Sequence, residues 1–295
     1  MKIGKISNIV LNLIIILLCA ITLYPLLLTI SVSLTSEQSI VESGYALIPK
    51  QWSFEAYSYI WDSRETILRA YAVTAFITVV GTILSVLTIS LIAYPLSRKD
   101  FKYRNAIALF IFFPTMFSGG LVAEYMLYVN VYNLADSIWV LILPYLTSAW
   151  YVVILRTFFT TNVPQAIIES AKIDGAGEFR ILFGMVFPMA IPGIATIALF
   201  KTLQFWNEYF NSLMYITDAD KYTLQFLLQT MMQNINELRN NTELAASMSS
   251  SELANIPAET ARMALCMVVL GPILIVYPFF QKYFIQGLTV GAVKG

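Results

Sequence analysis

Six long apolar stretches alternate with polar segments along the 295 residues of the chain. Each stretch is close to the roughly 20 residues that a helix needs to cross the hydrocarbon core of a bilayer. Backbone N–H and C=O groups inside lipid must bond within their own segment, so each stretch is predicted to be a helix. Pro114 and the Gly119–Gly120 pair interrupt the third stretch, and Pro144 lies inside the fourth. The predicted spans are 9–31, 71–96, 106–123, 137–155, 189–206 and 263–281.

The composition agrees with lipid as the solvent of this chain. It is 58% hydrophobic and only 12% charged, whereas soluble domains carry about 25% charged residues. The predicted fold class is therefore all-α, a polytopic membrane protein in which residues 1–295 form one transmembrane domain. A formal net charge of zero disfavours nucleic acid as a partner. The chain has no His, and its two cysteines, Cys19 and Cys266, lie in apolar runs. No metal site and no catalytic residue are predicted, and the cysteines are interpreted as packing residues.

The distribution of Lys and Arg predicts an orientation, because short cytoplasmic loops are enriched in these residues. Placing both termini in the cytoplasm puts most of the 18 Lys and Arg residues on the cytoplasmic side. The basic turn 98–104 carries the strongest signal, since it is short and lies between two spans. Segments 32–68, 124–136 and 207–262 are then extracytoplasmic loops. The first and third of these loops are long and hold Trp52, Trp61 and several Tyr residues, which are interpreted as interfacial anchors and loop-packing residues, with a docking face for an outside partner as the alternative.

The polar segment 162–188, between the fourth and fifth spans, is predicted to begin with a short helix. Asn162 is a suitable N-cap, Pro164 suits the first turn, and Gln165 stands three residues after Asn162, as in a capping box. Gly175 and Gly177 are expected to end the helix, because glycine adopts left-handed dihedral angles at little cost. A helix of about ten residues is marginal alone in water. It therefore needs a surface to pack on, either the lipid headgroups or a groove in a soluble partner.

The spacing within this segment resembles the EAA loop of ABC-importer permeases. That loop runs Glu-Ala-Ala, three residues, Gly, nine residues, then Ile-x-Leu-Pro. Four residues here fall at matching positions: Glu169, Ala171, Gly175 and Pro188. Three depart from the pattern by small or apolar exchanges: Ser170, Met185 and Phe187.

Two further segments resemble the carbohydrate branch of the same family. Residues 205–210, Phe-Trp-Asn-Glu-Tyr-Phe, are similar to its Trp-Asn-(Glu/Asp) motif, and the tail 287–295 is similar to the C-terminus of maltose-type second permease subunits. The long loop before the sixth span resembles the oligosaccharide members first named for lipoprotein-linked permeases. The resemblance covers essentially the whole chain and implies the type I ABC-importer permease fold.

The resemblance implies a set of partners and a division of labour. The chain would form half of a pathway with a second homologous permease, in a bacterial cytoplasmic membrane. Two cytoplasmic ATPases would hydrolyse ATP with Mg, and an extracytoplasmic solute-binding protein would deliver an oligosaccharide. The chain itself would be no enzyme and hold no cofactor, and it contains no Gly-x-x-x-x-Gly-Lys-(Ser/Thr) nucleotide motif.

Within the loop, coupling to the ATPases is assigned to Ile168, Glu169, Ala171, Lys172, Asp174, Gly175, Gly177 and Pro188. Ile168 and Ala171 are expected to insert into the ATPase, with Glu169 and Lys172 forming ion pairs at the rim. The glycine break is expected to let the helix tilt relative to the fifth span. The tail residues implied to reach between the ATPases are Gly287, Leu288, Thr289, Gly291 and Lys294. A frayed terminus is the alternative for the tail.

Sugars are bound by aromatic faces and side-chain hydrogen bonds, which defines candidates in the outer half of the bundle. These are Glu124, Tyr125, Tyr128, Gln204, Trp206, Asn207 and Tyr209. An ionisable residue at depth is a functional candidate, although Glu124 could also lie at the outer interface. In the maltose system the partner permease holds the sugar, so this subunit could contact it little.

Three alternatives remain open at this point. An importer of the same family could carry a non-sugar solute. An ion-coupled secondary carrier would instead show buried ionisable relays near the midplane, whereas these six spans are almost free of charge. An assembly factor without a pathway would not need a loop with this spacing.

Overall fold

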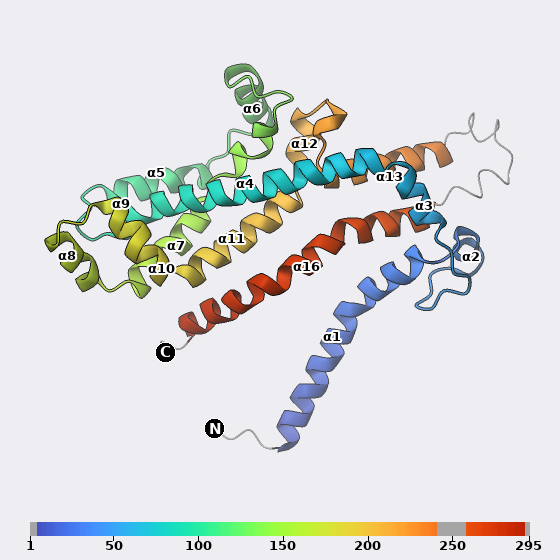
Figure 1. Ribbon diagram of the computed structural model, residues 1–295, viewed down its shortest axis with the longest axis horizontal. Coiled ribbons are helices and arrows are strands. Elements are labelled where there is room, and N and C mark those ends of the chain that lie inside the picture. Colours follow the sequence, from blue (N-terminus) through green and yellow to red (C-terminus); the bar gives the residue numbers. More distant parts are fainter. Residues whose placement is uncertain (1–4, 241–257, 293–295) are drawn as a thin grey trace. The chain divides into compact units, whose positions relative to one another are not determined.

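The computed structural model describes residues 5–240 and 258–292, and regular structure in these ranges is helical apart from one bridge between Thr35 and Trp52 (Figure 1). In the described part of the chain, three continuous helices are long and apolar enough to cross a membrane, in the first, second and sixth predicted positions. They are α1 (Lys5–Ser33), α4 (Arg64–Ser97) and α16 (Ala258–Ala292), which qualifies over Ala258–Ile275. Each extends beyond the span predicted for it.

The other three predicted spans are bent, and six spans result if each bent pair is one span. The third is α5 (Arg104–Met116) followed at 115° by α6 (Leu121–Met126) and η1 (Leu127–Val131). The interruption predicted at Gly119–Gly120 is confirmed, whereas α5 continues through Pro114 and the helical segment extends past residue 123. Gly120, with φ of +83°, lies in the break and starts α6 in a new direction.

The fourth and fifth spans bend less sharply. In the fourth, η2 (Ile138–Leu141) and η3 (Leu143–Tyr145) precede α7 (Ala149–Asn162) at 53°. In the fifth, residues 178–189 precede α11 (Ile191–Trp206) at 86°. Those residues form α9 (Glu178–Ile181), η4 (Leu182–Val186) and α10 (Phe187–Met189). The helix α11 ends at Trp206, the residue at which the fifth span was predicted to end, whereas α7 continues seven residues past the predicted end of the fourth.

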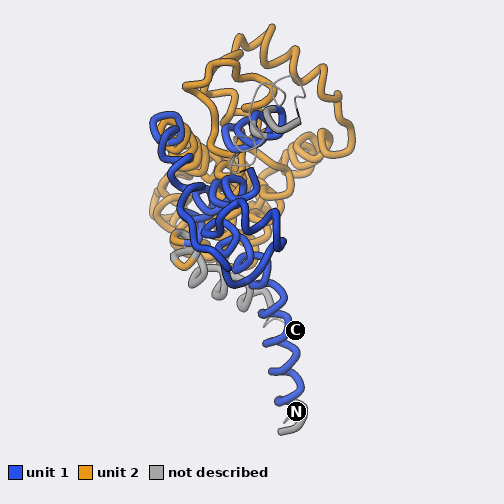
Figure 2. Tube along the Cα trace, turned by 90° about the vertical axis from the view of Figure 1, so that its right-hand side faces the viewer, with its two compact units in different colours: residues 1–67, 227–274 blue, residues 68–226, 275–295 orange. Residues whose placement is uncertain are grey.

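The described chain divides into two compact units, residues 1–67 with 227–274 and residues 68–226 with 275–295 (Figure 2). The first unit contains α1, α2 (Glu37–Ser43) and α3 (Glu55–Asp62). In it the buried Glu37 carboxylate caps the start of α16, accepting hydrogen bonds from the backbone N–H of Glu259 at 3.0 Å and of Thr260 at 2.9 Å. A carboxylate at a helix N-terminus satisfies donors that have no partner within the helix.

The second unit contains α4, α7 and α11 packed around two apolar clusters. Gly193 allows α11 to approach Phe158 of α7, and a Cβ at this position would lie 2.6 Å from the ring. Gly81 of α4 does the same for Phe205 of α11. In this unit α8 and α9 lie at one end of α4, and α12 (Phe210–Tyr215) lies toward the other (Figure 1). The predicted loop 207–262 is largely helical where described, with η5 (Ala219–Lys221) and α13 (Leu224–Asn240) after α12, while 241–257 lie outside the described residues.

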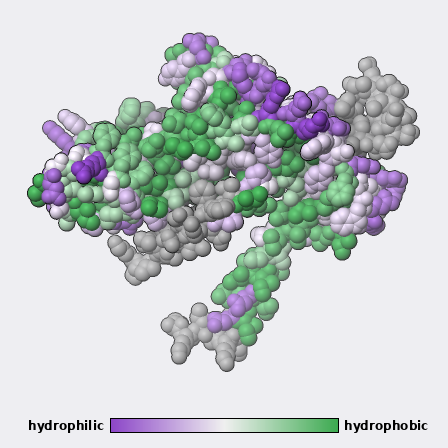
Figure 3. Space-filling model, viewed as in Figure 1, coloured by the Kyte–Doolittle hydropathy of each residue, from purple (hydrophilic) through white to green (hydrophobic). Residues whose placement is uncertain are grey.

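The surface agrees with a multi-pass membrane protein. Figure 3 shows α1 coloured as apolar over most of its length, and Ile16 and Leu13 on it are each more than 60% exposed. Polar side chains gather where α8 and α9 lie. Exposing such a continuous apolar surface to water is unfavourable in free energy, so α1 is suited to contact with lipid or with a partner helix.

Candidate functional site

The segment after the fourth predicted span forms a separate short helix, α8 (Gln165–Ile173). The predicted N-cap at Asn162 is wrong, because α7 runs through Asn162 and Pro164 is the residue before α8. Val163 adopts an extended conformation with ψ of 108°, as expected for a residue that precedes proline. Pro164 therefore separates two helices instead of entering the first turn of one.

The end of α8 is a closed, hydrogen-bonded turn. Gly175 has φ of +77°. Its N–H bonds to Lys172 C=O at 3.1 Å, and Ala176 N–H bonds to Ala171 C=O at 2.9 Å. This pair of bonds is a Schellman motif, which needs a left-handed residue at the glycine position. The prediction that Gly175 ends the helix is confirmed, whereas Gly177 has an ordinary φ of −70° and is the N-cap residue directly before α9.

Opposite faces of α8 have different environments. Ile168 and Ala171 are buried in the chain's own core, beside residues of α4, α7 and α9. The expectation that these two side chains insert into an ATPase is therefore wrong. The outward face instead exposes Ala166, Ser170 and Ile173, and Ile173 is 86% exposed. Their i, i+4, i+7 spacing is the pattern of anchors with which a helix docks into a groove.

A charged network holds α8 against two other segments. The Lys172 ammonium lies 3.0 Å from an Asp100 oxygen in the turn after α4, and 2.8 Å from a Glu178 oxygen in α9. Arg98 contacts the same Asp100 carboxylate at 3.3 Å, and the Tyr94 hydroxyl donates to Glu178. Lys172 was expected to pair at the rim of a partner, but here it joins three segments of its own chain.

The charges in this network stabilise one another. The hydrogen bond from Lys172 lowers the pKa of Asp100 to about 2, with Arg98 contributing and burial opposing. The hydrogen bonds to Glu178 and Asp100 raise the pKa of Lys172 above 10.5. The carboxylate contribution is thus present above pH 3.8 and is lost as the pH falls toward 2, and the ammonium contribution is present below pH 10.5. All three segments stay joined across the physiological range.

Replacing Lys172 by methionine is expected to reduce transport about two- to fivefold, because the two partly exposed ion pairs that it removes contribute together on the order of 0.4–1 kcal/mol. The loss should be constant between about pH 5 and pH 9, since neither partner titrates there. Solute uptake by membrane vesicles measures both effects. The control is Lys99→Met, which removes an exposed cation beside Asp100 in the turn after α4. Equal losses in both variants would contradict a specific role for Lys172.

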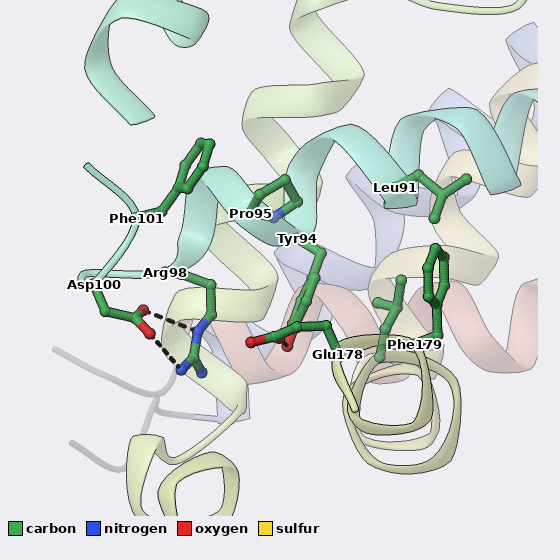
Figure 4. Close-up of a pocket in the computed structure, with 9 residues that line it drawn as sticks. Leu91, Tyr94, Pro95, Arg98, Asp100, Phe101, Glu178 and Phe179 are labelled. Atoms are coloured by element: carbon green, nitrogen blue, oxygen red, sulfur yellow. Dashed lines mark hydrogen bonds and ion pairs between the residues drawn. The ribbon is translucent and has the colours of Figure 1, made fainter. Parts of the chain in front are cut away.

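A cleft of about 400 Å³ lies beside this network (Figure 4). Leu91, Pro95 and Phe179 form its apolar walls, and Arg98, Asp100 and Glu178 supply charged groups at its edge. Phe179 is 71% exposed. The outward face of α8, the network and this cleft together make the end of the second unit a mixed polar and apolar surface.

The remaining residues assigned to coupling lie near this surface. Glu169 and Asp174 are exposed, and Asp174 is the last residue before the glycine turn. Pro188 lies in α10, directly before the 86° bend into α11. Of the tail, Gly287, Leu288, Thr289 and Gly291 continue α16, and Lys294 lies outside the described residues.

The predicted substrate residues fall into two groups. Glu124 and Tyr125 are exposed on α6, where Tyr125 stacks on Tyr215 at 5.5 Å, and Tyr128 meets Tyr215 edge-on at 5.8 Å. The other group lies at the C-terminal end of α11: Gln204, Trp206, Asn207 and Tyr209. Tyr125 and Tyr128 of the first group contact Tyr215 of α12, and Gln204 and Asn207 of the second group line one cavity with Tyr145.

Within the second group, the polar side chains of Gln204 and Asn207 make hydrogen bonds to residues of α11. Gln204 accepts a hydrogen bond from Lys201 at 3.0 Å, and the Asn207 amide donates to Leu203 C=O. Trp206 is buried beside Tyr71. Sequence reasoning placed Lys201 only as a cation near the end of its span, whereas the structure buries it almost completely.

Similarity to known proteins shows the family to which this chain belongs. Residues 86–290 match the family described as the binding-protein-dependent transport system inner membrane component. The chain belongs to this family. A permease of Bacillus subtilis (strain 168), the polygalacturonan/rhamnogalacturonan transport system permease protein YtcP, is 36% identical over 93% of each chain. Protein LplC of the same organism is 35% identical over 94% of this permease and 90% of its own length.

A solved structure has the same fold as this permease. It is a chain from the crystal structure of a bacterial ABC transporter involved in the import of the acidic polysaccharide alginate. The TM-score is 0.79 at 26% identity, covering 96% of this permease and 99% of that chain. The family resemblance carried by Glu169, Ala171, Gly175 and Pro188 is confirmed, and it favours an importer permease over an ion-coupled carrier or an assembly factor.

Proposed function

We propose that this chain is a permease subunit of an ATP-driven, binding-protein-dependent importer that carries an oligosaccharide across a bacterial cytoplasmic membrane. The observation that carries the proposal is α8, which buries one face in its own core and exposes Ala166, Ser170 and Ile173 on the other. A nine-residue helix with an outward i, i+4, i+7 stripe is suited to insertion into a groove of a soluble partner.

The proposed partners divide the work. Two cytoplasmic ATPases bind ATP and Mg, a second homologous permease completes the pathway, and an extracytoplasmic solute-binding protein delivers the cargo. This chain then contributes no catalytic residue and no cofactor. The basic turn 98–104 and α8 face the cytoplasm together with both termini, in agreement with the enrichment of cations in short cytoplasmic loops.

The contacts that hold α8 to α4 and α9 form a rigid joint, which would transmit motion from the ATPases. The Schellman turn at Gly175, the buried Ile168 and the two ion pairs of Lys172 hold α8 to the ends of α4 and α9. Because of these contacts, α8 would move together with α4 and α9 and would not show the tilt at the glycines that the sequence alone predicted. ATP-driven closure of the ATPases would therefore move α8, α4 and α9 as one rigid body. The bend before α11 would transmit this movement to the pathway-forming helices, which would rock as a unit.

A carbohydrate is the proposed cargo because of the relatives. YtcP is named for polygalacturonan and rhamnogalacturonan, and the structural relative takes part in alginate import. Permeases of Bacillus subtilis and of Halalkalibacterium halodurans, each 26–27% identical over more than 90% of this chain, are named for arabinooligosaccharides. Polymers of sugars, some of them acidic, are the shared chemistry.

Reconstitution tests this proposal. The permease pair and the ATPases, purified together in proteoliposomes, are expected to hydrolyse ATP faster when sugar-loaded binding protein is added. Sugar should accumulate only with ATP. Vesicles that lack this permease should show neither activity. Uptake that persists without ATP and collapses when an ion gradient is dissipated would instead establish an ion-coupled carrier.

A further inference from the structure

A second cavity, of about 520 Å³, lies between the start of α7 and the C-terminal half of α11. Tyr145, Trp150 and Tyr151 line it from the fourth predicted span. Lys201, Gln204 and Asn207 line it from α11. Its volume falls within the range of about 300–1,000 Å³ typical of small-molecule sites, which are mostly apolar with a few placed polar groups.

Lys201 is the unusual residue of this cavity. Its side chain is only 1% exposed. The ammonium donates to Tyr145 C=O and to Gln204 Oε1, and it lies 5.1 Å from the Tyr151 ring centroid. These contacts use two of the three N–H donors of an ammonium. Both acceptors are neutral, and within the described ranges no ion pair joins Lys201 to an acidic side chain.

An ammonium buried without an opposite charge is costly, since neutral acceptors and a ring do not replace its hydration fully. A residue needed only for packing on α11 would be apolar, as most of its neighbours are. Lys201 lines the cavity and has one N–H left to donate. A carboxylate bound in the cavity would accept this hydrogen bond and supply the missing negative charge.

The other walls suit a sugar ring. Trp150 is 66% exposed and offers a flat apolar face. Tyr151 is held in place by stacking on Phe200, with ring centroids 6.1 Å apart. Gln204 and Asn207 add amide groups that hydrogen-bond hydroxyls. One cationic donor, flat aromatic faces and amides are the combination expected for a sugar that bears a carboxylate.

We propose that this cavity is a subsite for a uronic-acid residue of the transported oligosaccharide, with Lys201 binding its carboxylate. The proposal rests on the proposed function, and it names the chemical class of the cargo and the residue that distinguishes it. The cavity and the surface around α8 lie at opposite ends of the α9–α11 segment. Specificity and coupling can therefore be altered separately.

The experiment compares trigalacturonate with its methyl ester, which has the same skeleton without the negative charges. The purified permease–ATPase complex, without binding protein, is heated with each sugar. Trigalacturonate is expected to raise the melting temperature of the wild-type complex and the ester to raise it less, because a ligand stabilises the state that it binds. Lys201→Met should abolish this difference, and Lys201→Arg should keep most of it.

Lys201→Met is also expected to raise the melting temperature without ligand, because it removes a buried charge from an apolar site. Lys221→Met, which removes a surface cation paired with Asp218, should leave the response to trigalacturonate unchanged. In reconstituted uptake with binding protein, Lys201→Met should lower trigalacturonate transport at least about tenfold, the equivalent of one lost charged contact.

Three results would overturn the inference. Lys201→Met could respond to both sugars as the wild type does. It could lose the response to both equally, which would indicate a structural role. The wild-type complex could transport neutral oligosaccharides and ignore trigalacturonate, and the proposed importer would then stand without this subsite. Failure of ATP-dependent uptake for every sugar would instead remove the proposed function itself.

Discussion

Ile173→Glu is expected to lower sugar uptake more than tenfold while leaving the permease in the membrane. Ile173 is 86% exposed at the end of α8, so a charged side chain there disturbs no contact within the chain. In a groove of the ATPase the same charge would be buried without a partner. Losses of 2 kcal/mol or more are typical of such central interface positions, and about 1.4 kcal/mol already corresponds to tenfold. Co-purification of the ATPase with the permease gives the direct measurement.

Gln165→Glu provides a matched control for this variant. It adds the same charge to the same helix at an exposed position outside the Ala166, Ser170 and Ile173 stripe. We expect it to retain the ATPase and most of the uptake. If Ile173→Glu retains both as well, the outward face of α8 does not contact the ATPase, and another part of the cytoplasmic surface must transmit the energy.

Apolar length was enough to predict helical segments at the six positions, three of them continuous helices and three of them bent pairs in the described residues. It was not enough to predict the bends of 115°, 53° and 86°, because the angle at a break depends on the packing of both flanking helices and not on the breaking residue alone. The fifth span illustrates this limit. The helix end at Trp206 was predicted, whereas the bend at Ala190 lies just before Gly193, where α11 approaches Phe158 of another helix.

The position of α8 was predictable from its pattern, but the roles of its faces were not. An apolar stripe containing Ile168 and Ala171 has the same appearance whether it packs on a partner or on its own chain, and only the folded structure shows that it is internal. The bridge from Lys172 to Asp100 joins residues 72 positions apart in the sequence. Lys201 was likewise seen as a single cation in an apolar run, with nothing in the sequence to show how deeply it is buried.

Gly175→Val is expected to abolish transport nearly completely. The Schellman turn requires φ of +77° at this position, which a β-branched residue adopts only with strain of about 1–3 kcal/mol. Among the described residues, and apart from the two chain neighbours of Gly175, no atom lies within 4 Å of a Cβ placed there, so the effect would come from the backbone and not from a clash. Relief of the strain would open the turn and release α8 from the ion pairs of Lys172 with Asp100 and Glu178 and from the core contacts of Ile168. Sugar-stimulated ATP hydrolysis should then be lost while basal hydrolysis persists.

Gly177→Val separates backbone conformation from side-chain size. Gly177 has equally open space around its Cβ position but φ of −70°, which valine adopts readily. We expect this variant to retain at least about half of the uptake, since the cost at a helix start is at most about 1 kcal/mol and falls mainly on stability. Equal loss in both variants would show that the ATPase contacts the glycine turn itself. Transport in Gly175→Val at the wild-type rate would show that coupling does not require a rigid joint between α8 and α9.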